Sequence, residues 1–236
     1  MKSNLPQDWQ VFQSPQALAD QALQSIIQIA SEAINQRQGF HFVTAGGSTP
    51  LQIYKMLAEF EKTSQGQAMN WQQWFIYIGD ERCLAESDSE RNSLALQNAW
   101  LSDSAIPAEN VFIMPAELGA NEAAKSYESV VKGVEFDLVL LGMGEDGHTA
   151  SLFPGHSHEH QADQLVQTEF NSPKAPPERV TLSAACLGNA RQLFKLISGA
   201  GKQAAVKEWL AGVSLPIAQV NAKETTVLIS QESLPA

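Results

Sequence analysis

The stretch DLVLLGMGEDGHTASLFPG, residues 137–155, decides the fold that we expect for this chain. It begins with an apolar run, residues 138–141, which is too short to span a membrane and has the length of a buried parallel strand. Several glycines follow within residues 142–147, and they permit backbone angles and close ligand approach that larger residues forbid. Asp146 and His148 therefore stand on a glycine loop at the carboxyl end of a buried strand, where open α/β sheets bind ligands. We interpret this loop as a candidate reaction centre.

Strand and helix patterns alternate between the amino terminus and this stretch. Apolar runs predict strands, and apolar residues at helical spacing predict amphipathic helices. The expected strands are residues 8–13, 40–44, 74–78 and 111–114, and the expected helices are residues 15–36, 51–60, 93–101 and 122–131. Such alternation predicts an α/β fold with a parallel sheet that is covered by helices on both faces.

Beyond residue 155 the order of elements is less regular. The expected strands in this part are residues 165–169, 179–183, 192–197 and 226–229, and one helix is expected to run from Lys202 to about Leu210. No repeat, low-complexity segment or linker divides the sequence, so we expect residues 1–236 to form a single domain.

Composition restricts the classes of partner. The 15 basic and 26 acidic residues give a net charge of −11, which argues against a nucleic acid or an anionic membrane as partner. A small anion stays compatible, because a few backbone N–H groups and one or two cations can bind it locally. The amino-terminal residues lack the apolar core of a signal peptide, and Cys83 and Cys186 fit no disulfide or metal pattern. We expect a cytoplasmic monomer or weak homodimer.

Four segments rich in glycine or charge each follow an expected strand. They are residues 45–50 (AGGSTP), 79–82 (GDER), 142–148 (GMGEDGH) and 198–202 (SGAGK). The carboxyl ends of parallel strands share one edge of a sheet, so we expect the four segments to meet there and to form one site.

The AGGSTP segment has the components of a phosphate-binding loop. Gly46 and Gly47 expose backbone N–H groups, and Ser48 and Thr49 offer hydroxyls. A helix is expected to begin at Pro50, with the positive end of its dipole toward these groups. The same residues are equally consistent with a glycine turn and a helix cap.

The charged residues of two other segments also have two interpretations. Lys202 lies in the first turn of a helix, where the dipole disfavours a cation, so a bound anion would explain it; a solvated lysine is the alternative. Asp80, Glu81 and Arg82 are either solvated loop charges or, for Arg82, a planar fork that binds a phosphate or an oxyanion.

Two further patterns resemble cofactor sites but are incomplete. GMGEDG matches the dinucleotide fingerprint GxGxxG, and Glu169 lies near the spacing of a ribose-binding acid. However, Pro154 ends any helix that would bind the pyrophosphate. His156, His158 and His160 alternate without a carboxylate or cysteine framework, so we favour a solvated loop over a metal site.

The segments taken together resemble one family. TAGGSTP, DERC, GMGEDGHTASLFPG, RVTLS and SGAGK, which follow one another in this order along the chain, are similar to the bacterial 6-phosphogluconolactonases. The resemblance runs from about Phe40 to Leu210, and the GxGxDGHTASLFPG portion is highly specific. After DER the family usually continues with a hydrophobic residue, Pro-Pro or similar, and then Ser-Asn. This chain instead has Cys83-Leu84-Ala85 and Glu90-Arg91-Asn92, which affects only the expected substrate contacts of that loop.

The resemblance implies a fold, a reaction and a set of site residues. The fold is a three-layer αβα arrangement with a mainly parallel, Rossmann-like sheet, related to glucosamine-6-phosphate deaminase. The reaction is hydrolysis of 6-phospho-D-glucono-1,5-lactone in the oxidative pentose phosphate pathway, without metal or other cofactor. His148 matches the proposed general base and Asp146 the acid beside it. The positions expected to contact the substrate are Gly46, Gly47, Ser48, Thr49, Asp80, Arg82, Gly144, Arg179 and Lys202.

The chemistry of these residues agrees with that reaction. A lactone carbonyl is already electrophilic, so hydrolysis needs an activated water and charge stabilisation rather than a covalent nucleophile. An imidazole with an ordinary pKa of about 6.5 is largely neutral at cytosolic pH and can accept a proton from water. Arg82 or loop N–H groups could stabilise the oxyanion.

Two competing functions fit the sequence less well. The deaminases of this fold carry a glutamate five residues after the histidine, where it supports ring opening, whereas this chain has Phe153 there. An apolar ring cannot carry a proton. A sugar-phosphate sensor on this fold would need a DNA-binding segment, for which we find no room and too acidic a composition. We therefore favour the lactone hydrolase.

Overall fold

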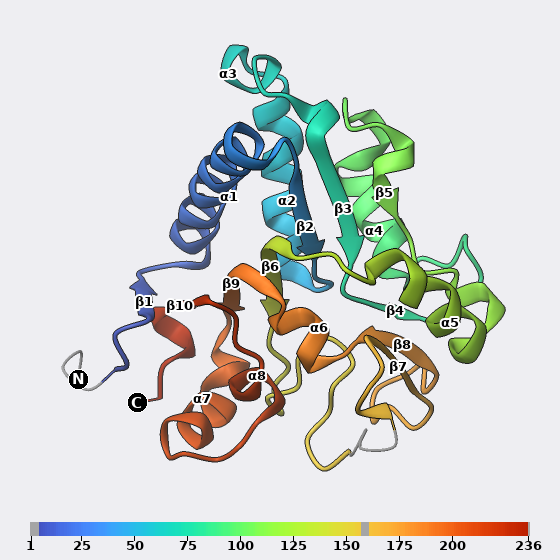
Figure 1. Cartoon of the computed structure of the whole chain (residues 1–236). Coiled ribbons are helices and arrows are strands. Elements are labelled where there is room, and N and C mark those ends of the chain that lie inside the picture. Colours follow the sequence, from blue (N-terminus) through green and yellow to red (C-terminus); the bar gives the residue numbers. More distant parts are fainter. Residues whose placement is uncertain (1–4, 157–160, 236) are drawn as a thin grey trace.

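The computed structural model describes residues 5–156 and 161–235, and a seven-stranded sheet lies at its centre (Figure 1). The strands are arranged in the order β1-β10-β9-β6-β2-β3-β5, and every neighbouring pair is parallel. Their bounds are β1 (Trp9–Phe12), β2 (Phe40–Thr44), β3 (Trp74–Ile78), β5 (Val111–Phe112), β6 (Phe136–Gly142), β9 (Ala190–Ile197) and β10 (Glu224–Ser230). The apolar run that decided our expectation is thus the middle strand.

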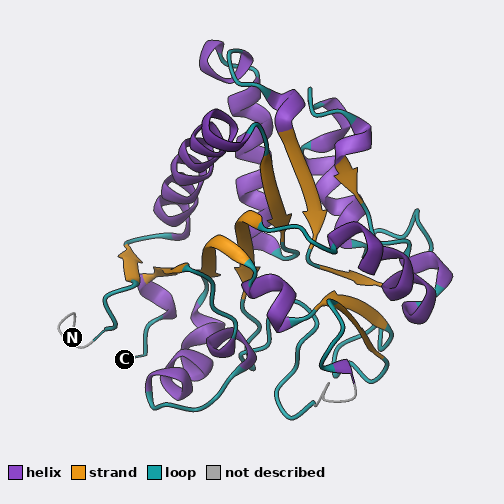
Figure 2. Cartoon of the chain, in the orientation of Figure 1, coloured by secondary structure: helices purple, strands orange, loops and turns teal. Residues whose placement is uncertain are grey.

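Helices flank this sheet and complete a three-layer αβα arrangement, which confirms the expected fold class (Figure 2). Their bounds are α1 (Pro15–Arg37), α2 (Ser48–Glu61), α3 (Ser64–Gln67), α4 (Asn92–Ala99), α5 (Ala120–Val131), α6 (Ala184–Gly188), α7 (Gln203–Leu210) and α8 (Pro216–Gln219). The longer helices α1, α2, α4, α5 and α7 agree with helices that the sequence predicts. The helices α3, α6 and α8 were not predicted, because four or five residues are too few to show a helical period.

Helix α1 shows how the local sequence sets an element and its position. Ser14 caps it by accepting a hydrogen bond from the backbone N–H of Ala17, and Pro15 occupies the first turn. The helix then buries one apolar stripe against the sheet: Leu18, Ala19, Ala22, Ile26, Ile29, Ala30 and Ala33. It ends at Gln38, which has a left-handed backbone with φ of 65°.

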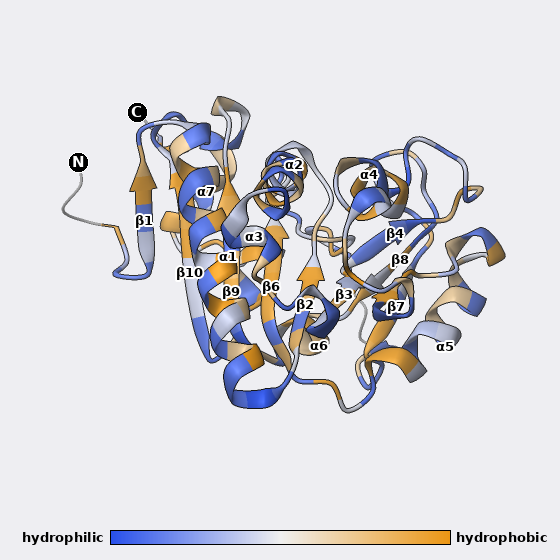
Figure 3. Cartoon of the chain, turned by 90° about the horizontal axis from the view of Figure 1, so that it is seen from above, coloured by the Kyte–Doolittle hydropathy of each residue, from blue (hydrophilic) through white to orange (hydrophobic). Residues whose placement is uncertain are grey.

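Strand β6 is buried on both faces, as a central parallel strand must be. Figure 3 shows that hydrophobic residues dominate it and its neighbours in the sheet. The one acidic residue in the strand, Asp137, is 2% exposed and is paired rather than solvated. It lies 2.8 Å from a guanidinium nitrogen of Arg37 and accepts a hydrogen bond from the backbone N–H of His41 at 2.8 Å.

A second, antiparallel sheet was not predicted. It has the order β4-β8-β7, with bounds β4 (Asp80–Arg82), β8 (Arg179–Leu182) and β7 (Val166–Glu169). Our expectation that GDER forms a loop is therefore wrong for its last three residues. These residues become a strand because they pair with β8, and a pairing between segments so distant in the chain leaves no local pattern.

Gly79 joins the two sheets. It is the only residue between β3 and β4, its N–H donates to the carbonyl of Thr44 in the large sheet, and its carbonyl accepts from Leu182 in the small one. The two bonds are 3.0 and 2.8 Å long. The two sheets are thus linked through the backbone of one residue.

Two smaller observations complete the fold. Strand β5 ends at Phe112 and not at Met114 as expected. Within the described residues, none of the helices combines the length and the apolar character that crossing a membrane requires.

Candidate active site

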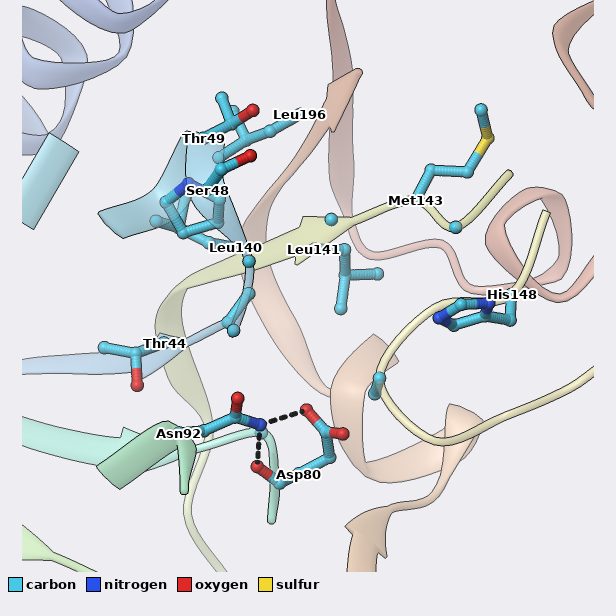
Figure 4. Close-up of a pocket in the computed structure, with 18 of the residues that line it drawn as sticks. Thr44, Ser48, Thr49, Asp80, Asn92, Leu140, Leu141, Met143, His148 and Leu196 are labelled. Carbon is cyan, nitrogen blue, oxygen red and sulfur yellow. Dashed lines mark hydrogen bonds between the residues drawn. The ribbon is translucent and has the colours of Figure 1, made fainter. Parts of the chain in front are cut away.

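The carboxyl ends of β2, β3, β6 and β9 border a cleft of about 430 Å³ (Figure 4). All four segments singled out in the sequence contribute to its lining, as the parallel topology predicts. Ten of the eleven predicted site residues line it: Gly46, Gly47, Ser48, Thr49, Asp80, Arg82, Gly144, His148, Arg179 and Lys202. The eleventh, Asp146, is bonded to His148. The structure brings these residues together, and their contacts with a substrate stay predictions.

His148 extends its ring into the cleft from the loop after β6 (Figure 4). Its Nδ1 lies 2.5 Å from Oδ1 of Asp146, which also accepts a hydrogen bond from the backbone N–H of His148 at 3.2 Å. A carboxylate can only accept, so Nδ1 carries the proton of the pair. Nε2 is then the unprotonated nitrogen of the neutral ring, and it is free to accept a proton.

Gly144 makes room for this pair. A Cβ atom on Gly144 would lie 2.0 Å from Nδ1 of His148 and 2.6 Å from Oδ1 of Asp146, far inside contact distance. The N–H of Gly144 donates to the carbonyl of His148 at 2.8 Å and closes the loop. The glycine is therefore required by close approach, and not by an unusual backbone angle.

The surroundings of the pair favour a neutral imidazole beside an ionised carboxylate. Burial lowers the pKa of His148, Asp146 opposes this, and the positive charges of Lys174 and Arg179 lower the pKa further. Burial alone would raise the pKa of Asp146, but the hydrogen bond and the charge of His148 outweigh it, and the net direction is downward. At neutral pH the ring is therefore an available base.

The phosphate-loop interpretation and the helix-cap interpretation of AGGSTP differ in one testable respect. Helix α2 begins at Ser48, so Gly47 is its cap residue, and no side chain caps it among the described residues. Ser48 and Thr49 lie inside the first turn, and Pro50 is its third residue and not its first. Neither hydroxyl serves as the cap, so the hydroxyls and the first N–H groups remain available to the cleft.

The AGGSTP loop is hydrogen-bonded to α2 on one side and lies close to Asn92 on the other. Tyr54, buried in α2, donates its hydroxyl to the carbonyl of Ala45 and accepts from the N–H of Ala45, both at 2.9 Å. On the other side, Asn92 donates to the Asp80 backbone carbonyl at 2.8 Å and to its carboxylate at 3.3 Å (Figure 4). A Cβ atom on Gly46 would lie 2.3 Å from Oδ1 of Asn92, so this glycine permits the contact between the two loops.

The GDER charges have three separate roles. Asp80 lines the cleft, accepts a hydrogen bond from Ser151 at 2.7 Å, and has its pKa raised by burial. Arg82 lines the cleft and donates to the carbonyl of Glu90 at 2.9 Å. The solvated interpretation is wrong for Glu81, which is fully buried.

Glu81 organises the start of α4. Its carboxylate accepts from the backbone N–H groups of Asn92 and Ser93, each at 2.8 Å, and lies 3.4 Å from Nε of Arg91. Arg91 is itself buried and donates to Glu117 at 2.9 Å. The acid thus satisfies N–H groups at the helix start, where the dipole favours a negative charge.

Arg179 and Lys202 both line the cleft, although Lys202 is the cap residue before α7 and not a residue of its first turn. Arg179 is 5% exposed and directs its guanidinium to backbone carbonyls, with its carbon 5.7 Å from the ring centre of Phe153. Lys202 is half-buried, and burial lowers its pKa against the opposing charge of Glu145. A bound anion remains compatible with its position.

Sequence reasoning missed Lys174 and Asn92, which both line the cleft. Lys174 lies in the proline-rich segment that was expected to be an ordinary loop, and nothing near it in the sequence indicates a site. Asn92 matches the asparagine of the family pattern Ser-Asn, which is a signal that could have identified it. The residues before it, Glu90 and Arg91, depart from that pattern.

The remaining candidates in the sequence do not join this site. Burial raises the pKa of the Cys83 thiol to about 12, which disfavours a thiolate. His156 pairs with Glu169 at 2.8 Å, while His158 and His160 lie outside the described residues. Elsewhere in the described chain, no three histidines, cysteines or acids gather as a metal site would require.

The chain is similar in sequence to known proteins of one family. It matches the family described as "Glucosamine-6-phosphate isomerases/6-phosphogluconolactonase" over residues 13–229. A 6-phosphogluconolactonase of Mycobacterium leprae is 30% identical over 243 residues, covering 96% of this chain and 96% of the relative. A probable chloroplastic 6-phosphogluconolactonase 3 of Oryza sativa is 31% identical over 211 residues, which cover 83% of this chain but only 63% of the relative's length.

A solved structure supports the same assignment. The crystal structure of 6-phosphogluconolactonase from Thermotoga maritima matches with a TM-score of 0.83 and 27% identity, covering 94% of this chain and 99% of that one. The agreement of the family match, the relatives and the fold shows that this chain belongs to the glucosamine-6-phosphate isomerase/6-phosphogluconolactonase family.

Proposed function

We propose that this protein hydrolyses 6-phospho-D-glucono-1,5-lactone to 6-phospho-D-gluconate, the lactone-opening step of the oxidative pentose phosphate pathway. The observation that supports this proposal most strongly is the His148–Asp146 pair. It presents an unprotonated Nε2 to a cleft whose lining includes cations and backbone N–H groups. The named relatives support the substrate class, since they are called 6-phosphogluconolactonases.

His148 acts as general base in this proposal. Nε2 takes a proton from a water molecule while the water oxygen attacks the lactone carbonyl carbon, and the carbonyl oxygen becomes an oxyanion. Asp146 holds the ring in the correct tautomer and stabilises the imidazolium that forms. When the tetrahedral intermediate collapses, the bond to the ring oxygen breaks and the imidazolium returns its proton to that oxygen.

The cleft supplies the charge that the intermediate needs. Arg82 and Lys202 line it, together with the backbone of the glycine loops, and we assign oxyanion stabilisation and substrate binding to these groups. Gly46, Gly47, Ser48 and Thr49 offer N–H groups and hydroxyls at the start of α2 for the phosphate. Asp80 and Gly144 complete the proposed binding set, and Arg179 supports the border of the cleft through its bonds to backbone carbonyls.

The deaminase alternative is less well supported by the site. Phe153 occupies the position of the deaminase glutamate, and its ring packs 4.8 Å from the His148 ring, centre to centre. A phenyl ring has no proton to exchange, so the ring opening and isomerisation of an amino sugar lack their carrier.

The test is hydrolysis of freshly prepared lactone above its spontaneous rate, measured as proton release at constant pH. The wild-type protein is expected to accelerate it, and His148→Ala is expected to lower turnover by about 10²–10⁴-fold while the circular dichroism spectrum is unchanged. A His148→Ala protein with wild-type turnover would remove the histidine from the mechanism. A wild-type protein that leaves the rate at background would overturn the function itself.

A further inference from the structure

The backbone of Lys174 is held more firmly than a solvated lysine requires. Its N–H donates to the hydroxyl of Ser172 at 3.2 Å, and its carbonyl accepts from the same hydroxyl at 2.7 Å. The carbonyl accepts a further bond from Arg179 at 2.9 Å. The side chain of Lys174 is nevertheless exposed at the border of the cleft. A fixed backbone beneath an exposed cation indicates that the position of the charge matters.

Arg179 supplies most of this support. Its Nε donates to the carbonyl of Pro176 at 3.1 Å, and its Nη2 donates to the carbonyls of Lys174 and Ala175 at 2.9 and 3.1 Å. The guanidinium is buried between this loop and Phe153. Three successive carbonyls thus converge on one side chain, a geometry that a lysine ammonium at this position would reproduce poorly.

The charge of Lys174 acts on the ionisable groups around His148. It lowers the pKa of both His148 and Lys202, and it contributes to the lowered pKa of Asp146. Among the described residues that line the cleft, Asp80 is the only acid, while the cations are Arg82, Lys174, Arg179 and Lys202. Cations gathered on one concave surface attract an anionic ligand.

We propose that Lys174 is a further substrate-binding residue of the cleft, which binds an anionic oxygen of the sugar phosphate. Arg179 is its positioning residue, and it acts through the loop carbonyls instead of contacting the substrate. This inference rests on the proposed function, because it takes the ligand to carry a phosphate and, after hydrolysis, a carboxylate. It revises the role that the family resemblance implied for Arg179.

The test measures binding of 6-phosphogluconate by titration calorimetry, which requires no turnover. Lys174→Met is expected to raise the dissociation constant by about 10-fold, the effect of losing one charge-assisted hydrogen bond. Lys125→Met removes the same charge from α5, outside the cleft lining, and should leave the constant within about 2-fold of wild type. Equal affinity of Lys174→Met and wild type would overturn the proposal, as would an equal loss in both variants.

Two probes identify which anionic oxygen is bound. Glucose 6-phosphate carries the phosphate without the carboxylate, and gluconate carries the carboxylate without the phosphate. Weaker binding of the first to Lys174→Met assigns Lys174 to the phosphate, and weaker binding of the second assigns it to the carboxylate. Unchanged binding of every probe contradicts the proposal.

The positioning role of Arg179 is tested by a double-mutant cycle. Arg179→Lys retains the charge but not the three-carbonyl geometry, so it should weaken binding in the wild-type background and add little to Lys174→Met. Fully additive losses would mean that Arg179 acts independently of Lys174. Thermal unfolding of each variant separates this effect from lost folding.

The kinetics provide a second readout and separate this inference from the proposed function. Removal of the Lys174 charge should raise the pKa of His148 and shift the acid limb of kcat/KM to higher pH, while Asp146 and Arg179 still act on the ring. An acid limb that does not move contradicts the electrostatic contact. If the wild-type protein hydrolyses no lactone, the proposed function fails, yet the binding comparison of Lys174→Met with Lys125→Met still decides the assignment.

Discussion

Burial of the His148 imidazole in the folded protein lowers its pKa below the ordinary histidine value. Because the proposed base acts in its neutral form, kcat/KM should fall only as the pH drops through this lowered value. We therefore expect the acid limb of the pH profile to have its midpoint below about 6.5, the ordinary histidine value. Steady-state rates between pH 4.5 and 8, at roughly half-unit steps, would locate it. A midpoint above the ordinary value would show that Asp146 dominates over burial.

A second residue-scale prediction concerns Lys195, an almost fully buried lysine on β9. Its ammonium donates to Asn221 at 3.0 Å and lies 5.0 Å from the ring centre of Trp209, and burial lowers its pKa to about 8. In the unfolded chain this amine keeps its proton to about pH 10.4, so between pH 8 and 10 the unfolded state binds more protons than the native state. Stability should therefore rise with pH across this window, by at most about 3 kcal/mol.

Chemical denaturation of wild type and Lys195→Met at several pH values would check the rise. The tyrosines and cysteines titrate alike in both proteins, so the difference between the two curves isolates Lys195. Parallel curves would mean that the amine keeps its proton in the native state.

At the residue scale, the sequence predicted the groups whose signal is local. His148 and Asp146 share one glycine loop, and Gly46 to Thr49 form one turn, so neighbours in the chain reveal them. Lys174 has no such signal, because what distinguishes it is a set of hydrogen bonds with Ser172 and Arg179. A position defined by contacts across a loop can be found only once those contacts are known.

At the scale of elements, α2 both frames the cleft and holds its loop through Tyr54. Tyr54→Phe deletes the hydroxyl that pairs with both backbone groups of Ala45, and it should cost about 1–3 kcal/mol of stability. The loop before α2 then loses its preorganised shape, so we expect KM to rise several-fold with a smaller change in kcat. Steady-state kinetics and denaturation of the same samples test this.

Tyr127→Phe is the matched control. Its hydroxyl is also buried and also joins two backbone groups, accepting from Ile78 and donating to Phe112, but it lies at the β3–β5 side of the sheet. A similar loss of stability without the rise in KM is expected. Equal kinetic changes in both variants would attribute the effect to general destabilisation.

Some elements can be predicted from their own residues, and others form only through pairing with a distant part of the chain. Helix α1 has a cap at Ser14 and a buried stripe at helical spacing, so its residues suffice to predict it. Strand β4 has three charged residues, and only its pairing with β8 makes it a strand. The local sequence accordingly predicts a solvated charge at Glu81, although this residue is buried at the start of α4.

At the scale of the whole molecule, a net charge of −11 coexists with a cleft whose charged lining residues are mainly cations. The reaction that we propose uses only groups of the protein and water, since a lactone carbonyl is already electrophilic. We therefore expect lactone hydrolysis to survive treatment with a chelator and passage through metal-free buffer, with at least about 80% of the rate retained. An activity that is lost on chelation and restored by zinc would direct attention back to the histidines at positions 156, 158 and 160.

The single residue Gly79, which links the two sheets, has a consequence for how this protein unfolds on heating. Since Gly79 is hydrogen-bonded to Thr44 on one side and to Leu182 on the other, we expect the cleft residues of the small sheet to stay in place as long as the core is intact. Inactivation and melting should then be the same event, with coincident midpoints for residual activity and for the aromatic circular dichroism signal. A protein of this design would go from fully competent to unfolded without passing through an inactive, still-compact state.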